Sequence, residues 1–213
     1  MRIGFYCESP ADQAAMAVFA EGMLGAPPEP INIDLEARPQ PAFFTVLDGA
    51  FRGVHYNSDA EGLVIVSDCD DADLHNSAHD ESGVDSGSCR LCKARKIIDK
   101  ARRQLKPRQG QPPLKVAIGL AVPAIEAWYL CGKHHQVGEA SWLMRLSFNQ
   151  PSFNRRQLKT LAYGTDRPSL EQETECAIRE ARRIIGNLKT IEDAFPIGFG
   201  LMAKEIRSWT ASV

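Results

Sequence analysis

The segment formed by residues 62–67, Gly-Leu-Val-Ile-Val-Ser, restricts the possible folds more than any other. Its residues are apolar and β-branched with no polar alternation, which is typical of a strand buried on both faces. Strand patterns also occur at residues 2–7, 31–33 and 114–120. Helical patterns separate these four segments, so the sequence predicts an α/β fold with a four-stranded parallel sheet and helices on both faces.

The second half of the chain has a different pattern. From Pro123 onward the apolar periodicity favours helices alone, and glycine, proline and asparagine separate them. We therefore expect an α/β domain over residues 1–131 and an all-helical C-terminal extension over residues 132–213 that packs on it. A length of 213 residues suits one domain with such an extension.

Composition excludes several classes of protein. A net charge of −2 excludes the uniformly basic surface of a nonspecific nucleic-acid coat protein. The longest apolar run, residues 116–125, ends at Glu126 and is too short to cross a membrane, so we expect no membrane partner. Glu8 comes too early for a secretory signal peptide, and six cysteines without such a signal predict reduced thiols in the cytoplasm.

The near-neutral total conceals two opposed charge blocks. Residues 59–85 carry nine acidic side chains and no lysine or arginine, whereas residues 86–108 carry nine basic side chains and one aspartate. One interpretation is an acidic solvated loop followed by a basic surface helix. The other is a helix that binds a nucleic-acid backbone beside a metal site. The candidate nucleic-acid contacts on this helix are Lys93, Lys96, Lys100 and Arg103.

Carboxylates follow three of the four predicted strands. Glu8 follows the first strand, Asp68 and Asp70 follow the third, and Glu126 lies just past the fourth. In an open parallel sheet, ligands bind beyond the carboxyl ends of the strands, so these side chains are expected to lie close together. A cluster of carboxylates favours a cation with oxygen ligands, Mg²⁺ or Mn²⁺. The alternative is that these acids cap helices or lie in solvent.

Three segments resemble motifs of one known family. Residues 5–12, Phe-Tyr-Cys-Glu-Ser-Pro-Ala-Asp, resemble the first motif of TOPRIM domains, a strand that ends in glutamate. Residues 63–70 resemble the second, a hydrophobic strand that ends in Asp-x-Asp. Residues 122–130 resemble the Pro-x-x-Glu-x-Trp-x-Leu motif of TOPRIM proteins related to RloB and the OLD-family nucleases, which are often found among phage-defence genes.

The resemblance implies a TOPRIM-like (Rossmannoid) sheet and a Mg²⁺-dependent nuclease that hydrolyses phosphodiester bonds in DNA or RNA. It implies that Asp68 and Asp70 hold the metal and that Glu8 is a further ligand or the general acid/base. The resemblance further implies that Glu126 completes the carboxylate ring and that Asp12 orients Glu8 or binds metal through water.

The sequence departs from the family pattern at two points. Glu8 is followed by Ser-Pro where many members have glycine. The lysine that stabilises the transition state in some OLD-family nucleases has no obvious counterpart, and Lys115 and Lys133 are candidates by location only. A catalytically silent TOPRIM module that binds or regulates together with an ATPase or other partner protein is therefore an alternative. A metal-dependent glycosyl- or phosphotransferase with an Asp-x-Asp motif is another, although it leaves Glu8 and Glu126 without a role.

A second candidate metal site lies in the loop after the third predicted strand. The spacing is His75-x3-His79-x9-Cys89-x2-Cys92, and two histidines with two cysteines are a valid tetrahedral set for a structural Zn²⁺. The alternatives are a solvated loop with free thiols and a redox-active Cys-x-x-Cys pair. Three other cysteines lie in apolar settings and are expected in the core, namely Cys7, Cys131 and Cys176.

Overall fold

A computed structural model of the chain describes residues 1–33, 42–81, 87–134, 136–148 and 154–210. It contains a four-stranded sheet in which every neighbouring pair is parallel, in the order β2-β1-β3-β4. The strands are β1 (Arg2–Tyr6), β2 (Glu29–Ile31), β3 (Gly62–Asp68) and β4 (Lys115–Ala121). The predicted α/β class with a four-stranded parallel sheet is confirmed.

Helices follow each strand, as the sequence pattern indicates. In the first half they are α1 (Pro10–Leu24), α2 (Ala42–Asn57), the short 3-10 helix η1 (Ser77–Asp80) and α3 (Arg90–Gln104). The later helices are α4 (Ile125–Leu130), α5 (Glu139–Ser147), α6 (Arg155–Tyr163), α7 (Leu170–Ile185), α8 (Leu188–Ala194), the π-helical turn η2 (Pro196–Gly200) and α9 (Leu201–Ser208). No helix in the described ranges is both long and apolar enough to cross a membrane.

Strand β3 shows why the segment at 62–67 predicts this architecture. All of its residues are buried. Val64 and Val66 join the core beneath α1 and α4, whereas Leu63 and Ile65 join the core beneath α2 and α3. Because successive side chains of a strand point to opposite faces, a fully apolar strand places one core on each side of the sheet.

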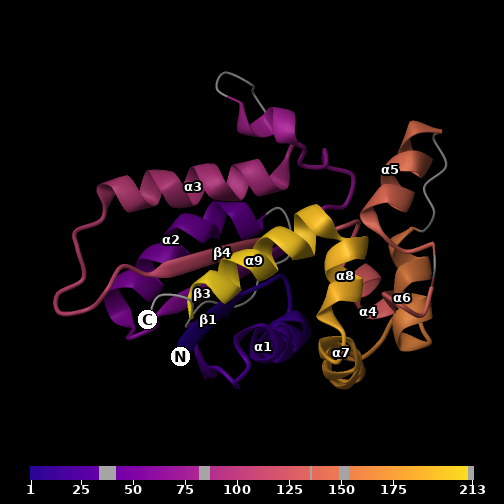
Figure 1. Cartoon of the computed structure of the whole chain (residues 1–213), viewed down its shortest axis with the longest axis horizontal. Coiled ribbons are helices and arrows are strands. Elements are labelled where there is room, and N and C mark those ends of the chain that lie inside the picture. The colour runs from indigo at the N-terminus through magenta and orange to yellow at the C-terminus, as the bar shows by residue number, and fades with distance from the viewer. Residues whose placement is uncertain (34–41, 82–86, 135, 149–153, 211–213) are drawn as a thin grey trace.

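The helices after β4 share the first of these cores. Helix α7 packs on α1, and α9 packs on β4. Phe199 of η2 makes edge-to-face contacts with Phe19 of α1 and Trp128 of α4, at ring-centroid distances of 5.2 and 5.1 Å. Figure 1 shows α5 to α8 grouped at the end of the molecule where α4 follows β4. This packing brings α6 to the carboxyl ends of the strands.

Candidate functional site: a carboxylate cluster at the carboxyl ends of the strands

The two central strands bring the first two carboxylates together. Glu8 lies two residues after β1, and Asp68 is the last residue of β3. The side chains of both are nearly inaccessible, with 8% and 6% exposed. Glu8 Oε1 accepts a hydrogen bond from the backbone N–H of Asp68 at 2.9 Å. The parallel pairing of β1 and β3 therefore places Glu8 directly on the turn that carries Asp68.

The turn after β3 holds Asp70 beside them. The backbone N–H groups of Cys69 and Asp70 donate to the carbonyl oxygens of Ala121 and Pro123. Asp70 has a φ of 45°, in the left-handed region that aspartate tolerates better than most residues. Arg90, the first residue of α3, donates to the Asp68 carbonyl oxygen at 2.6 Å and to Asp70 Oδ2 at 2.8 Å. These contacts fix the turn in place.

The start of α4 contributes the next carboxylate. Asp68 Oδ1 accepts from the backbone N–H of Ile125 at 2.9 Å, and Glu126 is the following residue. The Glu126 side chain is 5% exposed. Its Oε2 atom is buried and has no hydrogen-bond partner within the described part of the chain. An unpartnered buried carboxylate oxygen is costly, so this position favours a cation or a proton.

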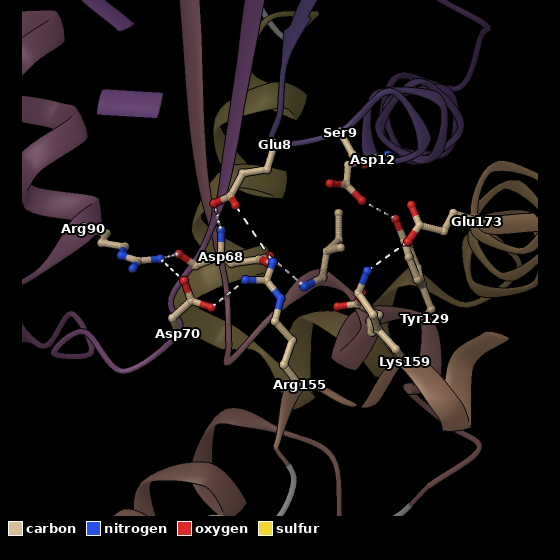
Figure 2. A network of polar contacts seen from close by, with 12 residues as sticks. Glu8, Ser9, Asp12, Asp68, Asp70, Arg90, Tyr129, Arg155, Lys159 and Glu173 are labelled. Atoms are coloured by element: carbon tan, nitrogen blue, oxygen red, sulfur yellow. Dashed lines mark hydrogen bonds and ion pairs between the residues drawn. The ribbon is translucent and has the colours of Figure 1, made fainter. Parts of the chain in front are cut away.

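Asp12 lies on the other side of the cluster, in the first turn of α1. Its Oδ1 atom accepts from the hydroxyl of Tyr129 at 3.3 Å, and its backbone N–H donates to Ser9 Oγ, the N-cap of α1. Figure 2 shows Asp12 next to Ser9, with a dashed line that joins it to the Tyr129 hydroxyl. The structure thus gathers all five sequence-predicted carboxylates of this site around the ends of β1, β3 and β4, namely Glu8, Asp12, Asp68, Asp70 and Glu126.

Arg155 of α6 occupies the middle of the cluster. Its Nη2 atom lies 2.5 Å from Asp68 Oδ2 and 4.0 Å from Glu8 Oε2, and its Nη1 atom lies 3.1 Å from Asp70 Oδ1. Figure 2 shows the guanidinium group between these three carboxylates. One arginine therefore contacts all three carboxylates that the sequence predicts as metal ligands.

Lys159 stands one helical turn after Arg155 on the same helix. Its Nζ atom is 2.9 Å from Glu173 Oε1 and 3.9 Å from Glu126 Oε1. The two lysines suggested by sequence location make other contacts: Lys115 donates to the carbonyl oxygen of Trp209, and Lys133 pairs with Glu180. The lysine that lies beside the cluster is Lys159. It falls outside the three segments that resemble TOPRIM motifs, the last of which ends at residue 130.

Burial and mutual repulsion control the protonation of the cluster. Burial, followed by the charge of Glu126, raises the pKa of Asp12 to about 7. Burial also raises the pKa of Asp68 well above its usual range, with Glu8 and Glu126 adding to the effect and Arg155 opposing it. Burial likewise raises the pKa of Glu126. The five carboxylates outnumber the three cations that contact them, Arg90, Arg155 and Lys159, so the cluster favours bound protons or an additional positive charge.

A cleft opens beside the cluster. It has a volume of about 640 Å³, and its polar lining includes Asp70, Arg90, Asn154 and Arg155. The apolar part of the lining comes from Pro123, Trp142 and Leu158 among others. The cleft thus exposes one carboxylate and two arginines of the cluster to a ligand from solvent.

The predicted nucleic-acid residues of α3 lie away from this cleft. Helix α3 meets the cluster at Arg90, and Arg103 comes thirteen residues later, about 20 Å along the helix axis. Lys93 lies over the ring of Phe44 at 4.7 Å, on the side that faces α2. Lys96 and Lys100 are exposed further along the helix. Their part in binding nucleic acid stays a prediction.

The histidine and cysteine residues of the loop after β3 also come together. One ligand atom from each of His75, His79, Cys89 and Cys92 lies within 4.8 Å of the others, so the group could hold a metal ion. All six cysteines are free and buried. Cys7 and Cys131 belong to the core beneath α1 and α4, and Cys176 donates to the carbonyl oxygen of Ala162.

Comparison of the chain with models of known families, with curated proteins and with solved structures finds no match.

Proposed function

We propose that the protein is a Mg²⁺- or Mn²⁺-dependent phosphodiesterase of the TOPRIM type that cleaves DNA or RNA. The observation that carries the proposal is the convergence of Glu8, Asp68 and Asp70 on one point beside a cleft that also contains Arg90 and Arg155. Buried carboxylates that follow neighbouring parallel strands are typical of a divalent-cation site. Arginines in the adjoining cleft are typical of phosphate binding.

The donor set fits a hard divalent cation. Glu8, Asp68 and Asp70 offer carboxylate oxygens on a common side, where the positive guanidinium of Arg155 already lies. The buried Oε2 of Glu126, which has no hydrogen-bond partner among the described residues, lies outside this donor set and stays available to a proton. Mg²⁺ and Mn²⁺ prefer such oxygen ligands and keep some of their waters.

The residues of the site would bind phosphate, accept a proton and position one another. A bound Mg²⁺ or Mn²⁺ supplies Lewis-acid activation of the phosphate and of an attacking water. Arg155 and Arg90 line the cleft, where their N–H groups would bind phosphoryl oxygens and stabilise the charge that develops on them. Glu126, whose pKa burial raises, would accept a proton at its Oε2 atom. Lys159 would hold Glu126 in position through its 3.9 Å ion pair.

The proposal is tested by cleavage assays on the full chain. End-labelled single-stranded DNA, duplex DNA and RNA, with bis(p-nitrophenyl) phosphate as a small ester, are incubated with Mg²⁺, with Mn²⁺ or with EDTA. We expect cleavage of a nucleic acid with either metal and none with EDTA, because the carboxylates act only through the cation. Metal binding in calorimetry without cleavage of any substrate would favour the silent binding module, and cleavage in EDTA would contradict the proposed chemistry.

The position of Arg155 leads to a separate prediction on metal affinity. The guanidinium and a divalent cation would compete for the same oxygens of Asp68 and Asp70. We therefore expect Arg155→Ala to lower the dissociation constant for Mn²⁺ by about tenfold, measured by calorimetry. Arg156→Ala is the matched control, since the Arg156 side chain is 78% exposed and faces Asp166 instead. Weaker Mn²⁺ binding by Arg155→Ala would show that the arginine does not compete with the cation.

A further inference from the structure

We infer that His75, His79, Cys89 and Cys92 form a structural zinc site that ties the loop after β3 to the start of α3. Three of these side chains belong to buried residues, and the fourth, His79, is partly exposed. His75 lies two residues before the short helix η1 and His79 lies within it, whereas Cys89 is the N-cap of α3 and Cys92 lies in its first turn. Four ligands from two segments, two nitrogens and two sulfurs, match a closed tetrahedral Zn²⁺ site.

The distances between the ligand atoms agree with this assignment. His75 Nδ1 lies 3.3 Å from Cys92 Sγ and 3.9 Å from Cys89 Sγ, and His79 Nδ1 lies 3.8 Å from Cys92 Sγ. With Zn–S near 2.3 Å and Zn–N near 2.0 Å, tetrahedral geometry separates neighbouring ligand atoms by roughly 3.3 to 3.8 Å. The three separations lie within or just above this range, and all four ligand atoms are within 4.8 Å of one another, so a small contraction around an ion would complete the site.

The groups around the histidine support the same conclusion. His75 Nε2 lies 3.3 Å from Asp80 Oδ2 and 3.3 Å from Arg95 Nη1, and the same Nη1 atom donates to Asp80 Oδ1 at 3.1 Å. The Asp80 carboxylate beside the outer ring nitrogen favours the tautomer in which the inner nitrogen, Nδ1, has its lone pair free for a metal. Histidine ligands of zinc in proteins almost always have such a partner.

The small amount of apolar surface that the loop buries explains why it would need an ion for stability. Cys89, Cys92 and Leu91 pack with Cys69, Val122 and Trp142 in a third, small core under the loop. Between Asp68 and Arg90 the chain has few large apolar residues, and Leu74 is only partly buried in this core. A segment that buries so little apolar surface gains stability mainly from a cross-link such as a metal site.

The site would also position Arg90 of the carboxylate cluster. Arg90 directly follows the ligand Cys89, and its guanidinium binds the Asp68 carbonyl oxygen and Asp70. A zinc ion bound to Cys89 would therefore hold the backbone of Arg90 in place, and with it the side chain that contacts the turn after β3. The zinc site itself is independent of the proposed phosphodiesterase activity, because none of its four ligands belongs to the carboxylate cluster.

Elemental analysis of the purified full chain tests the inference. We expect about one zinc ion per chain after expression in zinc-supplemented medium, and less than about 0.2 in Cys89→Ser and Cys92→Ser. Cys131→Ser is the matched control: Cys131 is buried elsewhere, contacts the carbonyl oxygen of Thr190, and should leave the zinc content unchanged.

Cobalt provides a readout that does not require any variant to fold. Wild-type protein stripped of metal and titrated with Co²⁺ should develop the intense visible absorption of a tetrahedral site and a thiolate-to-cobalt band in the near ultraviolet. Its thermal midpoint should fall after chelation and recover with Zn²⁺. A wild-type chain with less than about 0.2 zinc and with octahedral Co²⁺ spectra would overturn the inference, as would a Cys89–Cys92 disulfide in the native protein.

Discussion

Asp68→Asn is expected to lower metal-dependent phosphodiester cleavage by about 10³-fold or more while leaving the protein folded. Asp68 contributes one oxygen to the backbone N–H of Ile125 and the other, Oδ2, to the centre of the cluster where Arg155 lies. Asparagine keeps the first contact through its carbonyl oxygen. It replaces Oδ2 by an amide nitrogen, which cannot bind a cation.

The same substitution should not reduce stability by more than about 1 kcal/mol at neutral pH. Burial together with Glu8 and Glu126 raises the pKa of Asp68, so its charge is unfavourable in the folded, metal-free protein. Removing that charge offsets the loss of the contact with Arg155. Cleavage rate and urea denaturation are measured on the same preparation, so loss of activity through unfolding is distinguishable from loss of the metal site.

Asp73→Asn is the control for this substitution. Asp73 belongs to the same acidic run, but it is exposed and accepts a hydrogen bond from Ser88. The Asp73→Asn variant loses the same charge from the same acidic run, and we expect it to cleave as fast as the wild type. If Asp68→Asn cleaves as fast as the wild type, the metal site lies elsewhere.

The sequence predicts the part of the carboxylate cluster that strand order determines. Glu8 and Asp68 follow strands that pair directly, so a hydrophobic pattern and its end points suffice to bring them together. Glu126 is predictable for the same reason, because β4 pairs with β3 in register and delivers α4 to the same edge. These positions depend on the backbone topology alone.

The cations of the site depend on tertiary packing instead. Arg155 contacts Asp68 across 87 positions of sequence, because α6 packs against α4 at the end of the sheet. The available signal is local: Arg155 and Lys159 are four residues apart and therefore share one face of a helix. That spacing indicates a basic face without indicating what it contacts.

The basic block at 86–108 shows how little charge alone says about position. A run of cations beside a run of acids predicts a helix that binds a nucleic-acid backbone beside a metal site, and that binding stays a prediction. In the structure α3 runs along the sheet and presents only its first residue, Arg90, to the cluster, among the residues described. Only the end of a helix that lies at a site can contact it, so the charge content of a segment does not show which of its residues contact the cluster.

Gly198→Ala is expected to destabilise the protein by more than about 4 kcal/mol, the largest effect of a single methyl group that we predict on stability. A Cβ atom at Gly198 would lie 1.9 Å from the carbonyl oxygen of Leu120 in β4 and 3.0 Å from Glu139 Oε1. A strand carbonyl cannot rotate away as a flexible side chain can, so the turn η2 would have to leave the sheet.

That displacement would also break polar contacts. The backbone N–H groups of Ile197 and Gly198 donate to the two carboxylate oxygens of Glu139 at 2.9 and 2.6 Å. Glu139 is 4% exposed, so its carboxylate would be left buried without these donors. The aromatic ring of Phe199 would move with the turn and leave Phe19 and Trp128 unpacked.

Gly200→Ala in the same turn is the matched control. Its Cβ would lie 3.5 Å from the carbonyl oxygen of Glu192, an ordinary contact, and the residue has a helical φ of −62°. Alanine there should change the free energy of unfolding by less than about 1 kcal/mol, because it favours helix over glycine. Soluble yield and urea denaturation compare the two variants. Equal stability of the two variants would show that η2 does not pack closely on β4. Lower stability of Gly198→Ala alone would show that the close approach of η2 to Leu120 is required for the fold.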